Sequence, residues 1–226
     1  MNDIPVIIGI LFIATTFLTV WLFYISSGKN RTLLLFLLAF MLIQGIAGIS
    51  GFYQVTQTTP PRFILLIGPG LLFSILLFIT SEGRRFVDNL DIRKLTLLHT
   101  VRVPVEITLY FVYAAGLIPV LMTFEGRNYD IVSGITAPVI YYLVFTIRKS
   151  GYTALLVWNL ACLGLLINIM AIAILSSRTP FQKLAFDQPN IGVTYFPYIW
   201  LPGVVVPIVL ISHLAAIRQL MRRKKI

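Results

Sequence analysis

Seven long apolar stretches, separated by short polar or basic segments, make up most of the chain. Their approximate extents are residues 5–25, 32–50, 63–80, 95–121, 131–147, 152–176 and 197–217. A helix needs about 20 apolar residues to cross roughly 30 Å of hydrocarbon, and each stretch comes close to that length. The pattern predicts an all-α fold: a bundle of seven transmembrane helices that forms a single integral membrane domain over residues 1–226.

The composition indicates that the lipid bilayer, and not water, is the solvent of this chain. Hydrophobic residues make up 58% of the sequence, the mean hydropathy is +0.91, and only 12% of the residues are charged. Soluble domains carry about 25% charged residues. The formal net charge of +10 then indicates basic loops that face anionic lipid headgroups. The bilayer is the expected partner, and we expect no nucleic-acid partner.

The basic residues predict the orientation of the bundle, because they gather in alternate loops. One side has four: Arg62, Arg127, Arg178 and Lys183. The other side has thirteen: Lys29, Arg31, Arg84, Arg85, Arg93, Lys94, Arg148, Lys149, Arg218, Arg222, Arg223, Lys224 and Lys225. Cytoplasmic loops of membrane proteins are enriched in lysine and arginine. We therefore expect the N-terminus outside and the C-terminus in the cytoplasm.

Two loops and several prolines add local expectations. The cytoplasmic segment Ser81–Lys94 alternates charged and apolar residues, which fits a short interfacial helix or a solvated loop. The longest external loop, Ser177–Phe196, carries apolar residues that we expect to fold down on the outer mouth of the bundle. A proline inside a helix removes a backbone donor. Helix interruptions are therefore expected at Pro69, Pro104, Pro138, Pro202 and Pro207.

The fourth apolar stretch differs from the others because it contains a charged pair in its interior. Arg102 and Glu106 are four residues apart, which is the spacing of an ion pair on one helix face. We expect Glu106 near the midplane and Arg102 nearer the cytoplasm. At 100° per residue, five side chains fall within a sector about 80° wide: His99, Arg102, Glu106, Tyr110 and Tyr113. A charge at the bilayer centre costs about 2.5 to 3.5 kcal/mol, so this stripe is the first candidate for a functional site.

His213 is a second candidate, in the last apolar stretch. It lies about 9 Å to the cytoplasmic side of the middle of its helix, at 1.5 Å per residue, and this depth is level with Arg102. We hypothesise that its helix face meets the stripe in the cytoplasmic half of the bundle.

Three interpretations of this group are open. In the first, it is a ligand or proton pathway, in which Glu106 exchanges a proton, Arg102 holds an anionic group and the tyrosines line the outward path. In the second, His99 and His213 bind a metal ion or a haem in a redox protein. In the third, the charges clamp helices together in a structural subunit that has no ligand.

Arg127 and Asp130 precede the fifth apolar stretch and form a candidate external mouth. An acid at a helix N-terminus caps the helix and complements its dipole. Capping is therefore the first interpretation of Asp130, and an external gate or ligand contact is the second.

The sequence also lacks the motifs of several function classes. Every lysine lies in a loop or in the tail, so none can form a retinal Schiff base inside the bundle. No phosphate-binding glycine loop, HExxH or GxSxG motif occurs. The single cysteine, Cys162, excludes an internal disulfide framework. The sequence thus favours a protein without enzymatic activity or a cofactor, with the haem or metal interpretation as the alternative.

Two segments resemble a known sequence pattern. DIVSGITAP (Asp130–Pro138) is similar to a GDI-x-x-G-(L/I)-x-AP signature, and FPYIWLPGVVVPIVLISHLAAIRQL (Phe196–Leu220) is similar to a closing FP…P…VP…LH…RQL pattern. Both resemble an uncharacterised group of bacterial multi-pass membrane proteins. The resemblance implies a bacterial inner-membrane location and implies no mechanism. Taken with the stripe, the sequence predicts a small proton-coupled transporter or a ligand-sensing membrane protein.

Overall fold

The computed structural model describes residues 4–55, 58, 60–148 and 151–223. Within these ranges every regular element is helical, apart from one isolated β-bridge between Ser177 and Asn190. The predicted all-α fold is confirmed at this level. Lys149, Lys224 and Lys225, which contributed to the expected orientation, lie outside the described residues.

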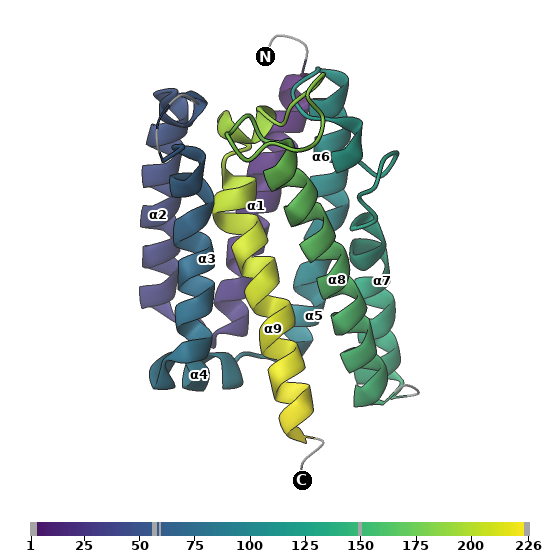
Figure 1. Cartoon of the computed structure of the whole chain (residues 1–226). Coiled ribbons are helices and arrows are strands. Elements are labelled where there is room, and N and C mark those ends of the chain that lie inside the picture. The colour runs from purple at the N-terminus through teal and green to yellow at the C-terminus, as the bar shows by residue number, and fades with distance from the viewer. Residues whose placement is uncertain (1–3, 56–57, 59, 149–150, 224–226) are drawn as a thin grey trace.

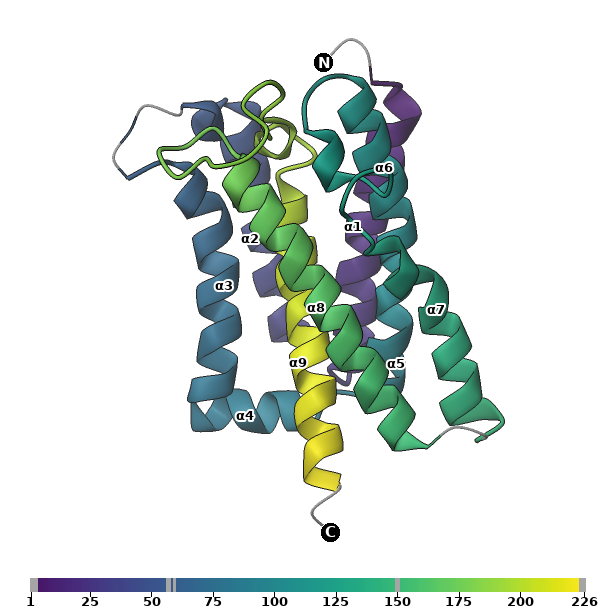
Figure 2. The same cartoon turned by 45° about the vertical axis from the view of Figure 1, so that its right-hand side comes forward.

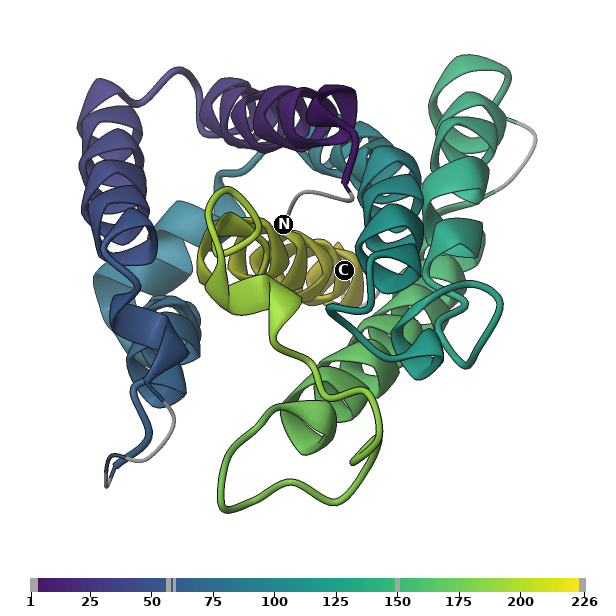
Figure 3. The same cartoon turned by 90° about the horizontal axis from the view of Figure 1, so that it is seen from above.

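Successive long helices run in opposite directions along one axis, and the two ends of the chain lie at opposite ends of the bundle (Figure 1). The long helices are α1 (Val6–Ser26), α2 (Arg31–Ile49), α3 (Phe63–Ile79), α6 (Arg102–Ala114), α7 (Ile131–Tyr141), α8 (Tyr152–Ser176) and α9 (Val206–Arg223). Seen from above, α9 occupies the centre and the other helices surround it (Figure 3). The most deeply buried side chains of α9 therefore face several helices at once.

Several of these helices are consistent with a membrane protein. Within the described ranges, five are long and apolar enough to cross a bilayer: Val6–Ser26, Arg31–Ile49, Ile92–Ala114, Tyr152–Ser176 and Leu201–Arg222. A sixth span results if α3 is counted together with α4 (Ser81–Asp88), to which it is bent by 90°. The apolar helix Ile131–Thr146 is shorter. The count of seven spans stays a prediction.

The fourth span begins earlier and ends earlier than residues 95–121. It consists of α5 (Ile92–Leu98), a 3-10 turn (His99–Val101) and α6. Asp91 starts it by accepting a hydrogen bond from the amide of Arg93 at 3.0 Å. The middle residue of this span is Val103, so of the two charged residues Arg102 lies nearer the centre of the helix than Glu106.

The segment after α3 is helical, as one of the two expectations for it stated. Thr80 caps α4 by accepting a hydrogen bond from the amide of Gly83 at 3.1 Å. α4 lies across the lower end of the bundle, where Figure 2 shows it between α3 and α9. Arg218 of α9 donates to Asp88 through Nε at 2.8 Å and Nη2 at 3.1 Å, and this pair ties α4 to α9.

The prolines affect the helices unequally. Leu201–Val205, which contains Pro202, is a π-helical turn before α9, and a second π-helical turn, Tyr142–Thr146, follows Pro138. By contrast, Pro69 lies inside α3 without ending it, so the interruption expected there is wrong. The adjacent Gly70 explains the tight packing at this point: a Cβ there would lie 2.4 Å from Cγ of Pro207.

The loop between α8 and α9 covers the upper end of the bundle, as expected. Gln188 donates to the carbonyl oxygens of Tyr113 at 3.2 Å and Ile118 at 2.6 Å. The amides of Ile191 and Gly192 both donate to the carbonyl oxygen of Leu117. These bonds fasten the loop to the chain that follows α6 and place it over the helices (Figure 1).

Candidate functional site

The polar stripe of the fourth span divides into a buried and a half-buried part. His99, Arg102 and Glu106 are each at most 3% exposed. Tyr110 and Tyr113 are half-buried, and the ring of Tyr110 stacks on Phe124 with centroids 5.3 Å apart. The charged members therefore face the protein interior, and the tyrosines lie further along the helix toward its upper end.

Arg102 forms its ion pair with Asp130 and not with Glu106. Nη1 of Arg102 lies 2.9 Å from Oδ1 of Asp130, and the two side chains are 3% and 7% exposed. Asp130 occupies the N-cap position of α7 but makes no side-chain cap bond to it, so the capping interpretation agrees with the position of Asp130 and not with its hydrogen bonds. Because Arg102 is near the middle of its span, Asp130 lies deep in the bundle and not at an external mouth.

Glu106 has a different partner, which no sequence pattern indicates. Nδ2 of Asn128 donates to both carboxylate oxygens of Glu106, at 2.7 and 2.8 Å, and to the carbonyl oxygen of Met122 at 3.0 Å. Asn128 is fully buried. Asn128 is uncharged and lies in a segment expected to be an external loop, so nothing in the sequence indicated that it binds the Glu106 carboxylate.

The chain around Asp130 explains why these groups meet. Oδ1 of Asn128 accepts a hydrogen bond from the amide of Asp130 at 3.1 Å, so one side chain orients the second carboxylate as well as Glu106. α7 packs closely on the 3-10 turn before α6. A Cβ at Gly134 would lie 2.8 Å from a methyl carbon of Val103, so glycine at this position permits the approach.

His213 meets the stripe at His99, one turn below Arg102. The two imidazole rings are stacked with centroids 3.8 Å apart and planes 14° from parallel. Nδ1 of His213 lies 2.9 Å from Oδ1 of Asn159 on α8, and Trp158 packs edge-on against His99 at 5.5 Å. The hypothesis that His213 reaches the stripe agrees with this geometry.

The stacked histidines do not fit a haem, because two axial imidazoles must leave room between them for iron and the porphyrin plane. Within the described ranges, no group of three or more histidine, cysteine or acidic residues can hold a metal ion. We therefore derive no redox chemistry from His99 and His213.

The buried charges border an apolar cavity of about 90 Å³. α6, α8 and residues 201–209 supply most of its walls, and α3 and Val193 of the loop between α8 and α9 also line it. Its polar lining consists of Arg102, Glu106, Asp130 and Asn190. A water needs only about 10 to 15 Å³ by this kind of measure, so the cavity has room for several waters or a small ligand.

Arg102 is under-satisfied where it meets this cavity. Apart from the contact with Asp130, none of its three guanidinium nitrogens has a hydrogen-bond acceptor within the described ranges. A buried guanidinium carries five N–H donors, and buried donors in folded proteins are normally paired. The free donors are therefore available to an acceptor in the cavity.

Arg127, the other residue of the expected mouth, lies elsewhere. Its side chain is exposed, and its carbonyl oxygen accepts a hydrogen bond from Asn168 of α8 at 2.8 Å. The structure thus separates Arg127 from Asp130 and gives Arg127 no place at the cavity.

Comparison with protein families places the chain in a group. A family model described as a domain of unknown function (DUF8737) matches residues 60–221. The chain therefore belongs to the DUF8737 family. No match was found among curated proteins, and none was found among solved structures.

The DUF8737 match extends from the start of α3 almost to the end of α9. It contains every residue of the buried polar cluster, which we define as His99, Arg102, Glu106, Asn128, Asp130, Asn159 and His213. α1 and α2 precede the match. The cluster and the cavity beside it are thus features of the DUF8737 part of the chain.

Proposed function

We propose that this DUF8737 protein is a seven-span protein of the bacterial inner membrane that binds a small amphipathic anion in the cavity beside Arg102. Binding is accompanied by proton uptake at Glu106. Such a site suits a small proton-coupled transporter or a ligand-sensing membrane protein. The under-satisfied guanidinium of Arg102, buried beside an otherwise apolar cavity, is the observation that carries the proposal.

The chemistry of the cavity supports an amphipathic ligand. Ligand pockets are mostly apolar, with a few polar groups that fix orientation. Guanidinium recognises carboxylate and phosphate groups with two parallel hydrogen bonds. Here one end of the cavity has the free donors of Arg102, and the walls are hydrophobic side chains such as Leu166, Ile169 and Val205. An alkyl chain with an acidic head matches both features.

The charges of the cluster support proton coupling. Two carboxyl groups, Glu106 and Asp130, lie near one guanidinium, so the cluster carries a charge of −1 when both carboxyl groups are ionised and both histidines are neutral. An anionic ligand would raise this to −2 in a region where unpaired charge is costly. A proton on Glu106 offsets one of these charges. Anion binding should therefore draw a proton onto Glu106, with His99 and His213 continuing the polar line toward the α4 end.

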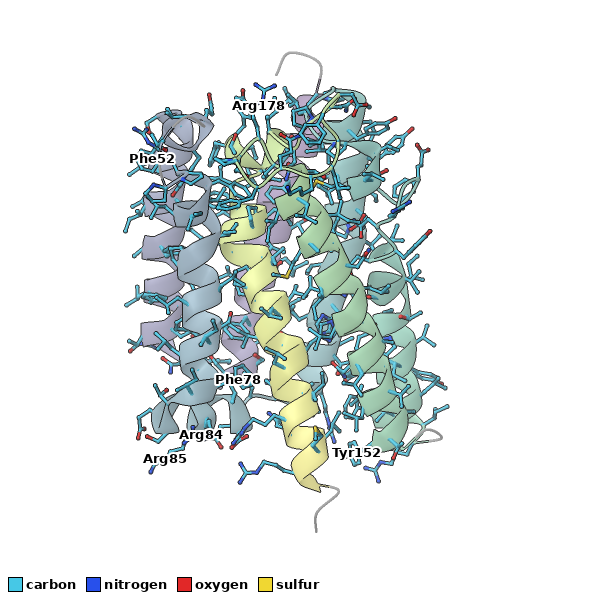
Figure 4. The ribbon with its side chains drawn as sticks, in the orientation of Figure 1. Phe52, Phe78, Arg84, Arg85, Tyr152 and Arg178 are labelled. Atoms are coloured by element: carbon cyan, nitrogen blue, oxygen red, sulfur yellow. The ribbon has the colours of Figure 1, made fainter. Side chains whose placement is uncertain are left out.

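Helix lengths and charge distribution support seven spans with the N-terminus outside. α3 is about 26 Å long at 1.5 Å per residue, close to the hydrocarbon thickness. The helix Ile131–Thr146 begins deep in the bundle, and the irregular segment before it would complete the seventh crossing. Arg84 and Arg85 lie at the α4 end of the bundle, and Arg178 lies at the other end (Figure 4). The excess of basic residues at the α4 end favours the cytoplasmic side for it.

The test uses octanoate and octanol, which have the same chain but differ in charge. Both are titrated against the purified protein in nanodiscs, and binding is measured by calorimetry. We expect octanoate to bind more tightly than octanol. Arg102→Lys keeps the charge but loses the planar fork, so it should weaken octanoate binding about tenfold. Arg31→Lys, at an exposed position, is the control.

A pH series tests the proton. Octanoate binding should weaken as the pH rises, because less proton is available to Glu106. Glu106→Gln should flatten this pH dependence, since glutamine cannot exchange a proton. Equal binding of octanoate and octanol would reject anion recognition by Arg102. An unchanged pH dependence in Glu106→Gln would reject the role of Glu106.

A further inference from the structure

A second apolar surface lies outside the cavity, in a groove between α3 and α9 near the α4 end. Ile75 and Ile79 of α3 form one wall, and Leu214 and Met221 of α9 form the other. Ile75, Ile79 and Met221 are between 54% and 66% exposed. In a membrane this groove faces lipid.

Basic side chains gather at the lower end of the groove. Arg218 and Arg222 line it and share one carboxylate, Asp88, so this group has an excess charge of +1. Arg84 of α4 is half-buried and donates to the carbonyl oxygen of Ile79. In Figure 4, Arg84 and Arg85 lie below Phe78, which also lines the groove. The apolar groove therefore ends at a group of side chains with a net positive charge.

The dimensions match one leaflet of a bilayer. From Leu71 to Ile79 the α3 wall is about 12 Å long at 1.5 Å per residue, and one leaflet contributes about 15 Å of hydrocarbon. An acyl chain along this wall would place its phosphate at the level of Arg218 and Arg222. Leu71 lines both the groove and the cavity, so the groove leads toward the cavity beside Arg102.

We propose that the groove between α3 and α9 is a binding site for an anionic phospholipid of the leaflet at the α4 end. The acyl chain lies between Ile75 and Leu214, and Arg218 and Arg222 bind the phosphate-bearing headgroup. Arginine binds phosphate oxygens with its planar fork, and basic side chains at a membrane surface attract anionic lipids. The proposal rests on the membrane placement above but not on the ligand of the cavity.

The experiment measures lipid binding to the purified protein by native mass spectrometry. Phosphatidylglycerol and phosphatidylcholine with identical acyl chains are titrated separately. We expect phosphatidylglycerol to bind more tightly. Arg222→Gln should weaken phosphatidylglycerol binding about fivefold, the effect of one basic residue near an anionic surface, and should leave phosphatidylcholine binding unchanged. Arg31→Gln, at the same end of the bundle, is the charge control.

A second pair of variants tests the groove itself. Ile75→Trp fills the groove and should weaken binding of both lipids. Leu72→Trp adds the same bulk at a position that is 57% exposed and does not line the groove, and should leave binding unchanged. Asp88→Asn frees both arginines and should tighten phosphatidylglycerol binding.

Three outcomes would overturn the proposal: equal affinity for the two lipids, an equal loss with Arg31→Gln, or no effect of Ile75→Trp. Octanoate binding in Arg222→Gln separates the two proposals. It should match the unmodified protein, so a failed lipid site leaves the result for the cavity standing.

Discussion

The ion pair between Arg102 and Asp130 makes a strong prediction about stability, because both charges are buried. Arg102→Met leaves the Asp130 carboxylate, 7% exposed, without a counter-charge, and Asp130→Leu leaves the guanidinium alone. The double variant removes both charges and replaces them with apolar side chains. We expect each single change to destabilise the protein strongly and the double change to restore most of the loss.

The magnitude follows from the burial of the pair. Removing one partner of a buried ion pair costs about 3 to 5 kcal/mol, whereas replacing both partners with apolar residues is often neutral or stabilising. For a chain of this size, 1 kcal/mol shifts the melting temperature by about 2 to 4 °C. The single variants should therefore melt about 6 to 20 °C lower, and the double variant should melt near the unmodified protein.

The chain contains a built-in reporter for the assay. Cys162 is the only cysteine and is 4% exposed, so a thiol-reactive fluorophore labels it only as the bundle opens. Melting curves of the four proteins in detergent then form a double-mutant cycle. Asp187→Asn, in the exposed part of the loop between α8 and α9, controls for loss of a carboxylate as such.

Two results would refute the reasoning. If Arg102→Met melts no lower than Asp187→Asn, the charges are not buried together. If the two single effects add in the double variant, the side chains do not interact. Octanoate should fail to bind the double variant even though it folds, because the double variant lacks the guanidinium. The same protein thus separates the structural role of Arg102 from its proposed role in recognition.

Two further predictions concern the packing and the α4 end. Gly70→Ala should destabilise the protein by about 1 to 3 kcal/mol, because a Cβ there would lie 2.4 Å from Pro207. Gly68→Ala is the control and should not destabilise the protein, because the nearest atom to a Cβ there is 3.9 Å away. Melting curves of both variants check this. The hydrogen bond from Arg218 lowers the pKa of Asp88 below its ordinary value of 3.8. The stability that this hydrogen bond contributes is therefore present above pH 3.8 and is lost as the pH falls through the lowered pKa. The melting temperatures of Asp88→Asn and the unmodified protein should differ by a few degrees at neutral pH and converge in strong acid.

The helices were predictable because their cause is local. Long apolar runs and loop boundaries placed α1, α2, α3 and α8 closely, whereas α6 ends earlier and α9 ends later than the runs predicted. The 100° periodicity put His99, Arg102 and Glu106 on one face, and all three side chains are buried. The continuity of α3 through Pro69 was not predictable from the sequence. Beside Pro69, Gly70 packs closely against Pro207 of α9, and a contact between distant segments leaves no local pattern.

The partners of the charged residues were also beyond the sequence. The spacing of Arg102 and Glu106 favoured a pair within one helix, but each side chain bonds to the segment before α7. Helix periodicity says which residues share a face and nothing about which loop folds against that face. Asp130 was placed outside because it precedes an apolar stretch, and only the fold reveals that this stretch begins deep in the bundle.

The late start of α7 is the strongest structural reason to place a ligand site here. An irregular backbone at membrane depth is tolerated only where it is buried in protein or lines a cavity, and transporters bind their substrates at such broken helices. The chain between α6 and α7 meets this condition through hydrogen bonds from Asn128, Gln188 and Gly192 to its carbonyl oxygens. A structural clamp needs only two charges on regular helices. Here an irregular segment brings a carboxylate to Arg102 and an amide to Glu106 beside a cavity, and a recognition site would use that whole arrangement.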